Sequence, residues 1–120
     1  MEIGILDADI NHCRDLCALV KKLEFAAVPI HTIERLSEYL SRFDQTAVIM
    51  NIDTMAIKNR DIRNLARKHR LTTFLCISEN KFHPDFKEAI CNHIFAWLKK
   101  PIDPDELSFF LNSIKKTQIK

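Results

Sequence analysis

Short apolar runs alternate along the chain with longer segments in which apolar residues recur every three or four positions. The short runs are typical of buried strands, and the longer periodicity is typical of helices that bury one face. The runs predict strands at residues 2–6, 25–30, 46–50, 72–77 and 93–98. The periodic segments predict helices at residues 10–23, 33–40, 57–69 and 84–92, and from Pro104 through at least Ile114.

Five strands that alternate with five helices predict a parallel sheet with helices on both faces. Because crossover connections are right-handed, few topologies remain, and the flavodoxin-like strand order 2-1-3-4-5 is the commonest for this size. Pro29 favours an edge position for the second strand, since proline cannot donate a hydrogen bond to a neighbour. We therefore expect an α/β fold of the (βα)5 type, in one domain over residues 1–120.

Composition narrows the functional classes. The net charge of +2 is too small to favour nucleic acid, and no apolar stretch approaches the length that crosses a bilayer. No secretory signal precedes the first strand, so we expect a cytoplasmic protein. The single glycine, Gly4, disfavours a nucleotide-binding enzyme, because phosphate-binding loops need several glycines.

The four cysteines are Cys13, Cys17, Cys76 and Cys91. Their spacing lacks the close pairs of a zinc site, and a free cysteine commonly behaves as a small buried residue. We expect them to be structural.

Polar residues follow four of the five predicted strands. Asp7 and Asp9 follow the first strand, Asn51 the third, Ser78 the fourth and Lys100 the fifth. In the predicted strand order these ends meet at one edge of the sheet, where ligands of open α/β folds bind. An acid pair, a hydroxyl and a lysine could handle phosphate, but the central residue is an amide.

These residues and their order resemble the receiver domain of response regulators in two-component signalling, over residues 3–116. The resemblance implies that Asp7 and Asp9 stand where the family binds magnesium, and that Asn51 replaces the aspartate that accepts phosphate. It implies that Ser78 stands where the family has a threonine or serine at the end of the fourth strand. It also implies that Lys100 is the lysine to which the fifth strand leads in that family. Two further positions are implied: Pro101 as a cis-proline candidate and Trp97 as the switch aromatic.

The substitution at Asn51 changes the expected chemistry. Formation of an acyl phosphate needs a carboxylate oxygen as nucleophile, which an amide lacks. Magnesium prefers anionic oxygens, and Ala8 stands where the family has another acid. We expect no cofactor and weak or absent Mg2+ binding, with Asp7, Asp9 and Asp53 as candidate ligands. Asn51 should accept a hydrogen bond from Lys100 and donate one to Asp7, with Asp7 and Asp9 facing Lys100.

The preferred function is an atypical receiver that is not an enzyme and that acts in signal transduction or transcription regulation through protein contacts. Its partners would be other signalling proteins, an output domain in a longer chain, or a second copy bound through the fourth helix, fifth strand and fifth helix. We expect no contact with nucleic acid or membrane. Phe82 and Phe109 should lie on the outer surface near that face, and Phe74, Phe95 and Phe110 in the core.

Two other functions stay open. A phosphorelay receiver could use Asp53 as a displaced phospho-acceptor with Mg2+, and a flavodoxin-like enzyme or flavin carrier could share the fold. Simpler roles also exist for single residues. Asp7 or Asp9 could cap the first helix, Ser78 could cap the segment after its strand, and Trp97 could serve only in packing.

Overall fold

The computed structural model describes residues 2–43, 46–80 and 92–118. Its strands are β1 (Glu2–Leu6), β2 (Ala26–Ile30), β3 (Ala47–Asn51), β4 (Thr73–Ser78) and β5 (Ala96–Lys99). Its helices are α1 (Ile10–Lys22), α2 (Ile33–Arg42), α3 (Asn59–Lys68) and α5 (Pro104–Gln118). The helix predicted at 84–92 falls almost wholly outside the described residues, as do Phe82 and Cys91. Within the described ranges, no helix is long and apolar enough to cross a membrane.

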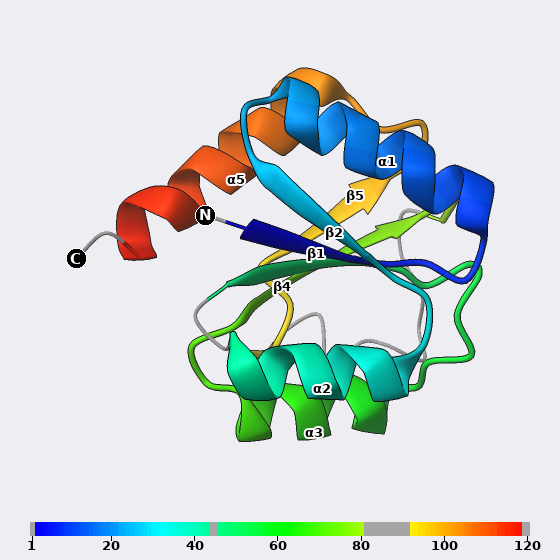
Figure 1. The fold of residues 1–120 in the computed structure, drawn as a ribbon, viewed down its shortest axis with the longest axis vertical. Helices are drawn as coiled ribbons and strands as arrows, with labels where there is room; N and C mark the ends of the chain where they lie inside the picture. The colour runs from blue at the N-terminus through cyan, green and yellow to red at the C-terminus, as the bar shows by residue number, and fades with distance from the viewer. Residues whose placement is uncertain (1, 44–45, 81–91, 119–120) are drawn as a thin grey trace.

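The five strands form one parallel sheet in the order β2-β1-β3-β4-β5, which confirms the predicted topology. β2 lies at an edge, as Pro29 predicts. Helices α1 and α5 cover one face of the sheet, and α2 and α3 cover the other (Figure 1). This arrangement places the carboxyl ends of β1, β3 and β4 next to one another.

The central strand shows why both faces need helices. All five residues of β3 are buried. Ala47 and Ile49 pack on the side of α1 and α5, whereas Val48 and Met50 pack on the side of α2 and α3. Alternate side chains of a strand point to opposite faces, so a strand that is apolar throughout is buried on both.

The described cysteines Cys13, Cys17 and Cys76 are buried free thiols within these cores. Burial raises the pKa of the Cys13 thiol to about 12, so this residue packs as a neutral side chain.

Two predicted elements begin two or more residues later in the structure. α3 begins at Asn59 rather than at residue 57, because Ile57 is buried as an anchor before the helix and the backbone N–H of Lys58 donates to the Asp61 carboxylate at 2.8 Å. β5 begins at Ala96 rather than at residue 93.

The core assignment of Phe95 was wrong, because this residue is 49% exposed. Its backbone N–H bonds to the carbonyl of Phe74 at 2.7 Å, but its ring packs edge-on against Phe110, with 5.9 Å between ring centroids. Phe74 is buried as predicted, and Phe110 is partly buried against the α1–α5 core. Phe109 is 66% exposed, which confirms its surface position.

The core around α5 gives a test of the packing. Leu111 is fully buried on this helix, so Leu111→Ala should lower the free energy of unfolding by about 2–5 kcal/mol. Phe109→Ala on the same helix should cost no more than about 1 kcal/mol, because it removes little buried surface. Urea denaturation followed by circular dichroism measures both. Equal losses in the two variants would contradict the assignment of faces.

Candidate functional site

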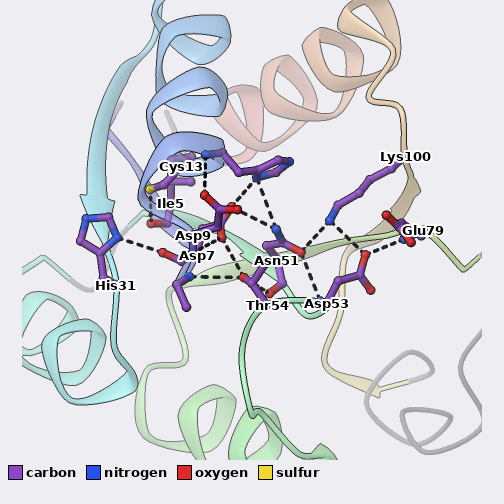
Figure 2. Close-up of polar contacts among 12 residues, drawn as sticks. Ile5, Asp7, Asp9, Cys13, His31, Asn51, Asp53, Thr54, Glu79 and Lys100 are labelled. Atoms are coloured by element: carbon purple, nitrogen blue, oxygen red, sulfur yellow. Dashed lines mark hydrogen bonds and ion pairs between the residues drawn. The ribbon is translucent and has the colours of Figure 1, made fainter.

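The polar residues that follow β1, β3, β4 and β5 gather at the carboxyl end of the sheet, where Figure 2 shows Asp7, Asp9, Asn51 and Lys100. Asp7 directly follows β1, Asn51 ends β3 and Ser78 ends β4. These three residues are completely buried. Lys100 follows β5, and the Lys100–Pro101 peptide bond is cis.

Asn51 lies at the centre and bonds in two directions. Its Nδ2 donates to Oδ2 of Asp7 at 3.0 Å, and its Oδ1 accepts from Nζ of Lys100 at 2.9 Å. The same Oδ1 accepts the backbone N–H of Asp53 at 3.1 Å. Lysine only donates and an ionised carboxylate only accepts, so the two ends of the amide match their partners.

Asp7 is a buried carboxylate surrounded by donors. Its Oδ1 accepts from the Thr54 hydroxyl at 2.7 Å and from the Asp9 backbone N–H at 2.9 Å. Its Oδ2 accepts from Asn51 and contacts Nδ1 of His12. Burial acts to raise the pKa of Asp7, but hydrogen bonds from Asn51, Thr54, His12 and the Asp9 N–H together lower it below the ordinary value. The carboxylate is therefore ionised at neutral pH.

The sequence did not single out His12 and Thr54 as members of this cluster. His12 lies in the first turn of α1, and helical side chains lean towards the amino terminus, which here lies beside the end of β1. That geometry was a usable signal. Thr54 lies in the loop after β3, where no periodic pattern indicates the direction of a side chain.

Lys100 does not face Asp7 and Asp9, which corrects the expectation. Its Nζ pairs instead with Oδ2 of Asp53 at 3.0 Å. The reason is the strand order, since β3 and β4 separate β5 from β1, and Asn51 lies between the lysine and Asp7. Asp9 points to solvent and caps α1, with Oδ1 accepting the His12 backbone N–H at 3.1 Å.

Asp53 has a second set of donors. Its Oδ1 accepts from the Ser78 hydroxyl at 2.8 Å, and its Oδ2 accepts from the backbone N–H of Glu79 at 2.7 Å as well as from Lys100. Partial burial acts to raise the pKa of Asp53, but the bonds from Lys100, Glu79 and Ser78 outweigh it and lower the pKa. The two carboxylates thus stand on either side of Asn51, each with its own donors.

Both oxygens of Asp7 and of Asp53 already accept hydrogen bonds from N–H and O–H groups, and one oxygen of the third candidate ligand, Asp9, caps α1. Magnesium needs ligand oxygens that point open lone pairs at one centre, whereas both oxygens of Asp7 and both of Asp53 face donors. Among the described residues no group of three or more His, Cys, Asp or Glu side chains is placed to hold a metal. This arrangement does not fit a magnesium ion.

Trp97 is connected to the site through a short loop. Its Nε1 donates to the carbonyl of Asn80 at 2.8 Å, and the Asn80 N–H donates to the Ser78 hydroxyl at 3.1 Å. Ser78 therefore both caps the segment after its strand and contacts Asp53. Hydrogen bonds through Ser78 and Asn80 therefore connect Asp53 to Trp97.

The chain matches no family model and no curated protein. It is similar in structure to a response regulator receiver domain protein from Clostridium thermocellum, with 16% identity, a TM-score of 0.79, and coverage of 99% of this chain and 98% of that one. The signal receiver domain of an HD domain-containing protein from Pseudomonas fluorescens Pf-5 shares 19% identity, with a TM-score of 0.83 and coverage of 98% and 95%. Full-length FixJ from B. japonicum shares 15% identity, with a TM-score of 0.84; the match covers 98% of this chain and 58% of that one. The fold is that of receiver domains.

The two lowered pKa values predict how stability depends on pH. A carboxyl whose folded pKa is below its unfolded value contributes stability above the unfolded pKa, and that contribution is lost as pH falls through the folded pKa. For Asp7 and Asp53 the ordinary value is 3.8. The free energy of unfolding should therefore fall as pH decreases from about 5 through this value and below it.

Urea denaturation at a series of pH values measures this dependence. In Asp53→Asn the fall should be shallower, because one of the two carboxyls no longer titrates. A stability that stays level or rises over this pH range would contradict the ionised buried cluster.

Proposed function

We propose that this protein is an atypical receiver that signals through protein contacts and does not carry an aspartyl phosphate at the usual position. The observation that supports it most is Asn51, an amide at the end of β3 with hydrogen bonds to both Asp7 and Lys100. The resemblance to receiver domains implies that this residue stands where the family has its phospho-acceptor. Signal transduction and transcription regulation are the processes in which such a module would act.

The chemistry of the amide supports this proposal. Phosphoryl transfer to a side chain requires an electron pair on a nucleophilic oxygen, and the amide of Asn51 has no anionic oxygen. Its Oδ1 already accepts two hydrogen bonds, from Lys100 and from the Asp53 N–H. The neutral amide also lets Asp7 remain ionised, since a second carboxylate at this distance would repel the first.

Asp53 is the second candidate, as a displaced phospho-acceptor. Its side chain is 25% exposed and lies 3.0 Å from Lys100, so a phosphodonor could reach it. Against this role, both of its oxygens are bonded to donors and its pKa is lowered, which makes the carboxylate a poorer nucleophile. Neither function makes the protein an enzyme that acts on other substrates.

The aromatic cluster of Phe95, Phe109 and Phe110 supports a contact surface beside β5 and α5. The Phe109 and Phe110 rings meet edge-on with 5.4 Å between centroids, and Phe95 and Phe109 are about half exposed or more. Exposed aromatic residues are common anchors of protein interfaces. We infer a second copy of this chain as the occupant, because symmetric pairs that bury the same patch on both copies are the commonest soluble oligomers. An output domain is the other outcome of the test, since full-length FixJ has the same fold within a longer chain.

Phosphorylation gives the direct test. Incubation with acetyl phosphate and Mg2+ should leave the intact mass unchanged, because no anionic acceptor stands at the usual position. A stable gain of one phosphoryl group that disappears in Asp53→Asn would establish the displaced acceptor instead. Trp97 fluorescence during a magnesium titration provides the parallel measurement, and it should not change in a saturable manner.

The aromatic surface gives a separate test. Sedimentation equilibrium should show a dimer whose dissociation constant rises at least about tenfold in Phe109→Ala, because the ring is an exposed anchor. Phe43→Ala is the matched control, since Phe43 is 55% exposed near α2, on the other face of the sheet. A strict monomer at high concentration would contradict the second copy as the occupant.

A further inference from the structure

Three donors from two separate segments converge on the carboxylate of Asp53. They are the hydroxyl of Ser78 at 2.8 Å, the backbone N–H of Glu79 at 2.7 Å and the ammonium of Lys100 at 3.0 Å. A hydroxyl, a backbone N–H and a cation are the groups that bind oxyanions in proteins. None of them belongs to the loop that carries Asp53, so the donors form a site and Asp53 enters it as a ligand.

The loop after β3 is held so that Asp53 reaches this site. The Asp53 backbone N–H donates to Asn51 Oδ1 at 3.1 Å, and the next residue, Thr54, bonds through its hydroxyl to Asp7. These two bonds fix the chain on either side of the Asp53 side chain. Both residues that hold the loop, Asn51 and Asp7, are themselves fully buried.

We propose that Asp53 is the built-in ligand of an anion site made by Ser78, Glu79 and Lys100, and that the site takes a small tetrahedral oxyanion such as phosphate or sulfate when the carboxylate is removed. The proposal deepens the function inferred above and rests on it, because it concerns how the same edge of the sheet is regulated. In the unmodified protein the site is always filled. No external phosphoryl group is then needed to hold the segment from Ser78 to Asn80 in one arrangement.

The consequence extends to Trp97. Ser78 accepts the Asn80 N–H, and the Asn80 carbonyl accepts the Trp97 indole N–H. The state of the anion site is thereby linked to an aromatic residue on β5. Trp97 is the only tryptophan in the chain, so its fluorescence reports on this link.

The test compares Asp53→Ala with Asp53→Asn. Both variants remove one negative charge, but only the alanine vacates the space that the carboxylate fills. Sodium sulfate or sodium phosphate is titrated at constant ionic strength, with sodium chloride as the balancing salt and Trp97 fluorescence and the thermal midpoint as readouts. The unmodified protein controls for the general stabilisation that sulfate gives to folded proteins.

Asp53→Ala should show a saturable fluorescence change and a rise in thermal midpoint, with a half-saturating anion concentration at least about tenfold below that of Asp53→Asn or the unmodified protein. Adding Lys100→Met to Asp53→Ala should abolish the saturable response. If Asp53→Ala is mostly unfolded without anion, sulfate should restore its near-ultraviolet circular dichroism, because a ligand that binds only the folded state favours folding.

Equal responses in Asp53→Ala and Asp53→Asn would overturn the proposal, since a general charge effect would then explain both. A response that survives Lys100→Met would overturn it as well. The proposed function fails by a different measurement, a phosphoryl gain in the intact mass of the unmodified protein. The two failures are therefore distinguishable.

Discussion

The amide of Asn51 joins two charged groups that would otherwise be separate at the end of the sheet. On one side its Nδ2 donates a hydrogen bond to the buried carboxylate of Asp7. On the other side its Oδ1 accepts hydrogen bonds from the Lys100 ammonium and the Asp53 backbone N–H. A carboxylate at this position could accept from Lys100 but could not donate to Asp7, and it would add a second negative charge beside it. The complementarity of donor and acceptor at one buried residue thus determines how the surrounding loops are placed.

Burying the charge of Asp7 has structural consequences beyond Asn51. An ionised carboxylate without water is costly unless its lone pairs are satisfied, and here donors come from α1, from β3 and from the loop after β3. The start of α1 is held by the same group, because the Asp9 N–H donates to Asp7 while the Asp9 side chain caps the helix. The polar cluster therefore fixes the relative positions of β1, α1 and β3 at this edge, as the apolar cores do on the two faces.

The topology and the membership of much of the site could be predicted from sequence, because both depend on strand order. Apolar runs locate the strands, and parallel strands bring Asp7, Asn51, Ser78 and Lys100 to one edge whatever their rotamers. The bonds of Asn51 to Asp7 and Lys100 also followed, since the chemistry of an amide leaves little choice. The pairing of Lys100 with Asp53 could not be predicted from the sequence. It depends on the path of a loop and on which strand lies between two side chains. Phe95 was misplaced for a similar reason: its spacing fits a strand, but β5 begins one residue later and leaves the ring outside.

The two carboxylates at the end of the sheet differ in burial and in what they contact. Asp7 is fully buried and its donors come from α1, β3 and the loop after β3, whereas Asp53 is partly exposed and contacts the segment that leads to Trp97. A group that regulates contacts must reach the surface, and of the two carboxylates only that of Asp53 is partly exposed. The neutral amide between them leaves each carboxylate with its own set of donors. Variation at Asp53 would then alter the surface near β5 and α5 while the centre of the domain stays intact.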